Sequence, residues 1–369
     1  MRNVTNSKLL YVRAMSRTPL MPVFDGHNDV LLRLIRGRAE PERAFLEGDN
    51  IGHLDWPRMK QGGFAGGFFA VYVPSETGSL DVDALMTRQR YDVPLPPQLE
   101  LGPSQQVTLH MTSLLLRIER ASKGEVKICR TAGDIRRCID AGTLAAILHI
   151  EGAEGIDPDL HMLDVLYESG LRSIGPVWSR PNIFGHGVPF RYPSSPDTGP
   201  GLTERGRELI RACNRLKIMV DLSHLNEKGF WDVAKLTDAP LVATHSNAHA
   251  ISPHSRNLTD RQLAAIRESR GMVGVNFATS FIRSDGMRND HTPLEDMIRH
   301  IDHLMKHVGV DGVGLGSDFD GATIPAEIGD VRGLPRLVDA MRRHGYDDAT
   351  LRKVCFENWV NVLERTWGR

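Results

Sequence analysis

Histidine and carboxylate side chains stand at the ends of several short apolar runs in this sequence of 369 residues. The first run ends in Asp-Gly-His-Asn-Asp, and residues two apart on a strand face the same side, so His27 and Asp29 can point together. The other runs of this kind end in Glu151, His224, His245 and Asp318. A carboxylate at the end of an apolar strand is costly to bury unless it is paired or bound to metal. Each run end has a structural explanation taken singly, but the set together predicts a site for two divalent cations.

Such a site has a definite chemistry. Two cations ~3.5–4 Å apart, bridged by a carboxylate, lower the pKa of a shared water toward neutrality. The hydroxide can then attack a carbonyl while the cations stabilise the oxyanion. An acid–base group must carry the proton from the water to the leaving amine, and Asp318, beside the metals but not needed as a ligand, fits this role. The residues therefore predict metal-assisted hydrolysis of an amide, ester or similar bond.

The elements that must position these side chains alternate between strand and helix. Eight runs are rich in apolar, Gly and β-branched residues: 23–29, 64–73, 144–151, 171–178, 218–224, 241–246, 272–278 and 312–318. Segments with helical periodicity lie between them, including 103–122, 203–216, 226–236, 259–267 and 292–308. In the last of these, Thr292, Pro293 and Glu295 predict a capping box.

This alternation predicts an α/β fold, a TIM-like (β/α)8 barrel with the binuclear metal centre at the C-terminal face of the strands. An open doubly wound sheet is the alternative. It would normally carry a Gly-rich phosphate loop, and neither G-x-G-x-x-G nor G-x-x-x-x-G-K-[ST] occurs. The segment 191–201 is rich in Pro and Gly, and could be a lid over the barrel mouth or a long surface connection.

Composition excludes several classes of protein. Lys and Arg number 45 against 46 Asp and Glu, so no global basic field attracts nucleic acid or an anionic membrane. No apolar stretch approaches the roughly 18 residues of a membrane span. Four scattered cysteines suit reduced thiols and a cytoplasmic location. Residues 1–20 carry four basic and no acidic side chains, which predicts a basic arm before a single domain over 21–369.

Several motifs together resemble the membrane (renal) dipeptidase family of the metal-dependent amidohydrolase superfamily. They are DGHND, HIEGAEG, LTERGRELIRACNRLKIMVDLSH, THSNAHAISPHSRNLTD, GMVGVNF and GLGSDFDG, followed by FENWVNVLER, which resembles the closing helix of the family. The resemblance implies an eight-stranded barrel with two Zn²⁺ or other divalent cations. It implies that His27 and Asp29 bind one zinc, Glu151 bridges, and His224 and His245 bind the other.

Further residues follow from the same resemblance. Arg256, followed by Asn257, matches the arginine that holds a substrate carboxylate, and a guanidinium fork suits that task; a surface arginine is the alternative. Asp318 matches an aspartate beside the bridging water. One departure is that Trp178 stands where animal members carry a substrate-contacting histidine. His186 could replace that histidine, or Trp178 could shape the pocket while His186 is a loop residue.

The resemblance implies a zinc-dependent dipeptidase that hydrolyses free dipeptides, tolerates a D-residue at the C-terminal position and acts through a metal-bridging hydroxide. Two alternatives stay open: an N-acyl-amino-acid or lactone hydrolase on the same centre, and a non-catalytic barrel stabilised by metal. Lipid-anchor and secretion signals of the family are missing here, so we expect a soluble form. A homodimer is possible, and Trp56, Trp231 or Trp359 could lie at its interface or in the core.

Overall fold

The computed structural model describes residues 20–37, 39–75 and 81–368. The basic arm predicted over 1–20 lies outside the described residues except for Leu20. Within the described part of the chain, no helix combines the length and the apolar character that crossing a membrane requires.

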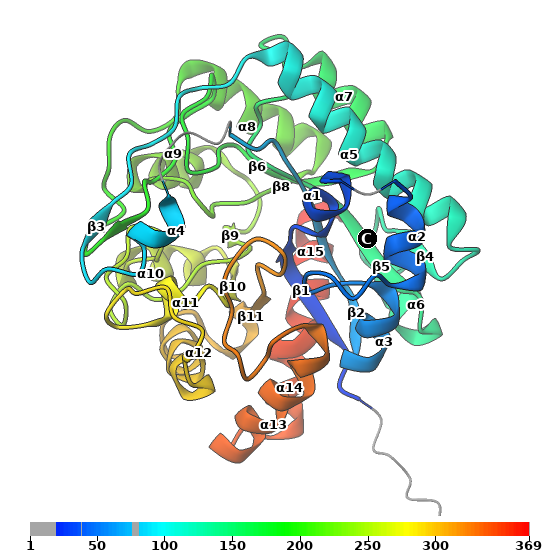
Figure 1. Cartoon of the computed structure of the whole chain (residues 1–369). Helices are drawn as coiled ribbons and strands as arrows, with labels where there is room; N and C mark the ends of the chain where they lie inside the picture. The colour runs from blue at the N-terminus through cyan, green and yellow to red at the C-terminus, as the bar shows by residue number, and fades with distance from the viewer. Residues whose placement is uncertain (1–19, 38, 76–80, 369) are drawn as a thin grey trace, which may run out of the picture.

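Eight parallel strands form a nearly closed barrel, as the alternation predicts (Figure 1). Their order around the barrel is β8-β6-β5-β2-β1-β11-β10-β9. The two ends of this sheet meet at a parallel bridge between Asp221 and Val242, where the N–H of Leu222 donates to the Val242 carbonyl at 2.8 Å. The barrel strands are β1 (Val23–Asn28), β2 (Phe64–Tyr72), β5 (Leu144–Glu151), β6 (Leu171–Gly175), β8 (Met219–Val220), β9 (Val242–Ala243), β10 (Met272–Asn276) and β11 (Val313–Gly316).

Helices cover the outside of the barrel. They are α1 (Val30–Ile35), α2 (Pro41–Glu47), α3 (Trp56–Gly62), α4 (Val82–Leu85), α5 (Leu101–Ala121), α6 (Ala132–Ala141), α7 (His161–Glu168), α8 (Glu204–Leu216), α9 (Glu227–Leu236), α10 (Asp260–Glu268), α11 (Thr279–Ile282), α12 (Leu294–Val308), α13 (Leu334–His344), α14 (Asp348–Arg352) and α15 (Asn358–Trp367). The helical elements also include two single turns of 3-10 helix, at Val310–Gly312 and Val331–Gly333, and a π-helical turn at Lys353–Glu357.

Side-chain caps begin three of the predicted helices. Thr203, Asn226 and Thr259 each accept a backbone N–H as the N-cap of α8, α9 and α10. The capping box predicted at Thr292 is wrong. The N-cap of α12 is Pro293 and makes no side-chain bond, because the Thr292 hydroxyl donates instead to the Asn289 carbonyl at 2.6 Å in the preceding turn.

The end of the barrel opposite the site is filled by the C-terminal segment. Trp359 of α15 is fully buried, and its Nε1 donates to the Leu315 carbonyl of β11 at 2.9 Å. A Cβ on Gly274 of β10 would lie 2.9 Å from the Trp359 ring and 2.0 Å from the Thr244 carbonyl, so only glycine fits there. Trp359 is therefore a core residue.

Two long connections meet above the barrel. The short strand β7 (Arg191–Tyr192) pairs antiparallel with β3 (Tyr91–Asp92), which belongs to the connection after β2. Tyr91 and Tyr192 pack with Phe281 of α11 in a small apolar cluster. The segment 191–201 is thus anchored to a second connection at its start. The connection after β2 is also more structured than its sequence suggests, because it includes β4 (Val126–Ile128), which pairs with β5.

Candidate metal centre

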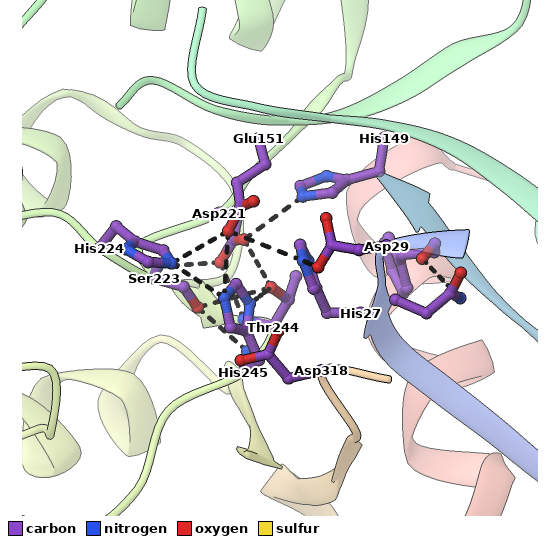
Figure 2. Close-up of polar contacts among 12 residues, drawn as sticks. His27, Asp29, His149, Glu151, Asp221, Ser223, His224, Thr244, His245 and Asp318 are labelled. Atoms are coloured by element: carbon purple, nitrogen blue, oxygen red, sulfur yellow. Dashed lines mark hydrogen bonds and ion pairs between the residues drawn. The ribbon is translucent and has the colours of Figure 1, made fainter. Parts of the chain in front are cut away.

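Three imidazoles converge on one carboxylate at the C-terminal face of the barrel (Figure 2). The Nε2 atoms of His224, His245 and His27 lie 3.0, 3.3 and 3.7 Å from Oε1 of Glu151. His224 and His245 follow β8 and β9, Glu151 ends β5, His27 is the last residue but one of β1, and all four are buried. Positions up to 218 residues apart in sequence are therefore brought to one point, as the strand ends predict (245 − 27).

A second group of ligand atoms overlaps the first. His27 Nε2 lies 3.4 Å from Oδ2 of Asp29, and ligand atoms of His27, Asp29 and Asp318 all fall within 4.8 Å of one another. Ligand atoms of His27, Glu151 and His245 form another group within the same distance. Two overlapping groups of nitrogen and oxygen donors suit two neighbouring divalent cations.

The charges and unpaired atoms of the site fit bound cations. Both ring nitrogens of His27 are buried and lack a hydrogen-bond partner, which is unusual for buried polar atoms. Burial raises the pKa of Glu151 well above its ordinary value, and the nearby Asp29 and Asp318 raise it further. Burial lowers the pKa of His27, but Glu151, Asp29 and Asp318 outweigh it and raise that pKa to about 10. Bound divalent cations would offset the negative charge of these buried carboxylates.

Hydroxyl groups orient two of the imidazoles. Nδ1 of His224 lies 2.8 Å from Oγ of Ser179, and Nδ1 of His245 lies 2.8 Å from Oγ1 of Thr244. Thr244 Oγ1 donates to Oδ2 of Asp221 at 2.5 Å, so it must accept from His245. The proton of His245 then sits on Nδ1 and leaves the Nε2 lone pair free for a metal. No pattern in the sequence distinguishes Ser179, Thr244 or Asp221 as supports of the imidazoles.

Two site residues have left-handed backbone. His224 has φ 67° and Asp318 φ 59°, a region that residues other than glycine seldom adopt. Each follows its strand, and the turn directs its side chain into the mouth of the barrel. Asp318 is held by its N–H, which donates to the His27 carbonyl at 3.0 Å, and by Nδ2 of Asn276, which donates to Oδ2 at 3.0 Å.

Arg256 is a buried guanidinium beside this centre. Its Nη2 donates to the His245 carbonyl at 3.1 Å and its Nη1 to Oγ of Ser246 at 3.4 Å, while Nε has no partner. Among the described residues, no carboxylate forms an ion pair with it within 4.0 Å. Burial lowers its pKa to about 10, against the raising effect of Asp318 and Glu151 at longer range. The guanidinium thus lies near the centre with no carboxylate of the described residues paired to it and with Nε unused.

A cavity of about 560 Å³ opens over the centre, with Asp29, Glu151, His224 and Asp318 among its lining residues. Trp178 forms part of its wall; its ring lies 5.1 Å from that of Tyr72 and 5.7 Å from that of His224, measured between centroids. Of the two roles that the sequence leaves open for Trp178 and His186, this geometry favours a tryptophan that shapes the pocket.

Two residues predicted to bind substrate make hydrogen bonds to backbone carbonyls. His186 is absent from the cavity lining, and its Nδ1 lies 3.2 Å from the Gly201 carbonyl within the loop. Asn257 is buried, and its Nδ2 donates to the carbonyls of Ser252 and Phe281 at 2.9 and 2.8 Å. Asn257 therefore holds the loop that carries Arg256, and the substrate-binding roles of His186 and Asn257 stay predictions.

Comparison with known proteins assigns this arrangement to a family. The model of the membrane dipeptidase family, peptidase family M19, matches residues 13–367. The chain belongs to the membrane dipeptidase family. Its members are metallo-dipeptidases, so the chain is identified as a metal-dependent hydrolase of peptide bonds.

Relatives of this family resemble the chain over most of its length. An uncharacterized protein in the pqqA 5′ region of Klebsiella pneumoniae is 52% identical over 266 residues, which are 72% of this chain and 98% of that protein. A crystal structure of a metallo peptidase from Rhodobacter sphaeroides, liganded with a phosphinate mimic of the dipeptide L-Ala-D-Ala, is 61% identical with a TM-score of 0.93. That match covers 95% of this chain and 100% of the other.

A more distant dipeptidase shares the fold. The probable dipeptidase PvdM from Pseudomonas aeruginosa is 21% identical, with a TM-score of 0.79 over 94% of this chain and 96% of that one. The two chains therefore share the barrel fold although their sequences are only distantly similar.

Proposed function

We propose that this member of the membrane dipeptidase family hydrolyses free dipeptides and accepts a D-residue at the C-terminal position. The observation that carries the proposal is the Rhodobacter sphaeroides structure, 61% identical over 95% of the chain, which holds a mimic of L-Ala-D-Ala. The guanidinium of Arg256, which has no carboxylate partner among the described residues and an unused Nε, supports the same substrate, because a dipeptide presents a carboxylate at its D-residue.

The buried donors provide ligands for two cations. His27 and Asp29 would hold one, His224 and His245 the other, and Glu151 would contact both. Imidazole nitrogens and carboxylate oxygens at an open site match catalytic zinc, which we propose as the metal. When bound, the two cations supply a water of lowered pKa and polarise the substrate carbonyl.

The chain itself supplies proton transfer and positioning. Asp318 takes the proton of the attacking water and delivers it to the leaving amine. Asn276 holds Oδ2 of Asp318, which leaves Oδ1 to carry the proton. Burial raises the pKa of Asp318, which favours the protonated form that must donate to the amine.

Arg256 fixes the substrate carboxylate and so places the single peptide bond at the centre. The rings of Trp178, Tyr72 and Phe190 wall the cavity and exclude water from the bound side chains. Cleavage of a longer peptide at any bond except its last would leave no carboxylate one residue beyond the scissile bond, so such a cleavage cannot use the Arg256 contact.

The test measures amine release by zinc-loaded protein from L-Ala-L-Ala, L-Ala-D-Ala and N-acetyl-D-alanine, each with a chelator control. We expect chelator-sensitive turnover of the two dipeptides and none of the acetylated compound. Turnover of the acetylated compound alone would make the chain an N-acyl-amino-acid hydrolase. Absence of all three activities in metal-loaded protein would refute the proposal.

A further inference from the structure

A second cluster of metal-ligating side chains lies on the outer layer of helices. His303 and His307 are one turn apart on α12, and Asp260 is the first residue of α10, which packs against α12 (Figure 1). His303 Nε2 lies 2.7 Å from Oδ1 of Asp260, and His307 Nε2 lies 3.8 Å from Oδ2. One donor atom from each of the three falls within 4.8 Å of the others.

The spacing of these atoms suits a tetrahedral cation. Bonds of ~2.0–2.1 Å at the tetrahedral angle separate ligand atoms by about 3.3 Å. His303 Nε2 makes a hydrogen bond of 2.7 Å to Oδ1 of Asp260, and His307 Nε2 lies 3.8 Å from Oδ2, so a bound cation would take the place of the proton in that hydrogen bond. Residues four apart on a helix share a face, and this fixes both imidazoles toward the same point.

The two imidazoles also stack on one another. Their centroids are 4.3 Å apart with planes at 21°, so both rings approach Asp260 from the same face of α12. Neutral imidazoles carry the lone pairs that a metal needs. Their side chains are only 17% and 26% exposed, so both rings are largely withdrawn from solvent.

The third histidine of α12 is excluded from the cluster. His300 is fully buried, its Nδ1 accepts the N–H of Ala248 at 3.1 Å, and its Nε2 donates to the Ile282 carbonyl at 2.8 Å. Both of its nitrogens are therefore occupied. The helix turns His300 toward the barrel, which accounts for its burial.

We propose that His303, His307 and Asp260 form a separate site for a borderline divalent cation such as Zn²⁺, Co²⁺ or Ni²⁺. The cation would cross-link α10 to α12, with water completing its coordination. The site is structural and independent of the hydrolytic centre. Imidazole and carboxylate ligands favour these ions over Mg²⁺ and Ca²⁺, which prefer oxygen.

The test compares metal content after equilibrium dialysis against micromolar zinc chloride. We expect wild-type protein to retain one more zinc per chain than the double variant H303A/H307A, and dipeptide turnover to be equal in both. The matched control is H291A, which removes an exposed histidine outside the cluster and should bind as much zinc as wild type. Equal zinc content in wild type and double variant would overturn the proposal.

A second variant distinguishes the loss of a metal ligand from a packing defect. Asp260→Asn keeps the size of the side chain and lacks the anionic ligand, so zinc should raise its Tm less than that of wild type. Cobalt in place of zinc gives an independent readout, since a tetrahedral cobalt band should be weaker in Asp260→Asn and unchanged in H291A. Identical zinc-induced Tm shifts and cobalt spectra in all three proteins would refute the site, whatever their hydrolytic activity.

Discussion

Oδ2 of Asp318 accepts a hydrogen bond of 3.0 Å from the side-chain amide of Asn276. The bond fixes a carboxylate whose backbone is already held in the left-handed region, so its second oxygen has a defined position over the centre. A group placed in this way can move a proton repeatedly without losing its orientation.

Replacing Asp318 by Asn tests that role. The variant keeps the size and the hydrogen-bonding capacity of the side chain but removes its basic oxygen. We expect kcat for L-Ala-D-Ala to fall by about 10²- to 10⁴-fold with metal content unchanged. Steady-state kinetics and metal analysis measure both, with the exposed Asp339→Asn as control. Full activity would contradict the role, and loss of a metal would make Asp318 a ligand instead.

Arg256 should determine the requirement for a free carboxylate. Changing it to Gln removes a charged hydrogen-bond donor worth roughly 1.5–3 kcal/mol, so kcat/KM for a dipeptide should fall about 10- to 150-fold. The corresponding dipeptide amide lacks the carboxylate and should be hydrolysed poorly by wild type. Its rate should be almost unaffected by the substitution. An equal loss on both substrates would show that Arg256 acts on the structure rather than on the carboxylate.

Thr244 should control metal affinity without touching the metal. Thr244→Val removes the hydroxyl that links Nδ1 of His245 to Asp221, so the imidazole is no longer fixed in the correct tautomer. Loss of such a supporting bond typically weakens metal binding 10- to 100-fold, which chelator competition would measure. Thr112→Val is the control, because the buried hydroxyl of Thr112 has no partner. Equal affinity in wild type and Thr244→Val would contradict the argument.

His300 should make stability fall on mild acidification. Burial lowers its pKa from 6.5 to about 4, so between these pH values the unfolded chain binds a proton that the folded chain does not. The contribution of His300 to the free energy of unfolding is complete above pH 6.5. It falls by roughly 3 kcal/mol as the pH drops toward 4.

Urea unfolding of His300→Gln across this range is the measurement. The variant should be less stable at neutral pH but show a shallower dependence on pH than wild type. His291→Gln should keep the wild-type slope, because this side chain is exposed. A slope in His300→Gln equal to that of wild type would assign the acid sensitivity to other histidines.

The ends of the strands could be predicted from the sequence, because burial and the alternation of strand and helix restrict which residues can form them. A run of apolar residues that stops at His27, Glu151 or His245 marks both the strand and the place where its side chain leaves the core. Parallel strands then bring those ends to one face of the barrel. The fold and the convergence of the ligand residues follow from this pattern alone.

The direction in which loop side chains point could not be predicted in the same way. His186 and Asn257 have the types expected of a substrate site, but their loops turn them toward the Gly201, Ser252 and Phe281 carbonyls. No periodicity states which way a loop residue points. Ser179 and Thr244 were missed for a related reason, since a hydroxyl becomes a support only through a neighbour that folding provides.

The first barrel strand pairs with the last, at Asp25 and Leu315, and Trp359 fills the barrel from below. In a nascent chain β1, which carries His27, can pair with β2 early, but its other edge has no partner until β11 has been synthesised. We expect the barrel to close around the ligands only after the segment that carries Trp359 has been synthesised. A chain cut short before this segment should fail to retain metal even though it contains every ligand, so translation itself sets the order in which folding and metal uptake occur.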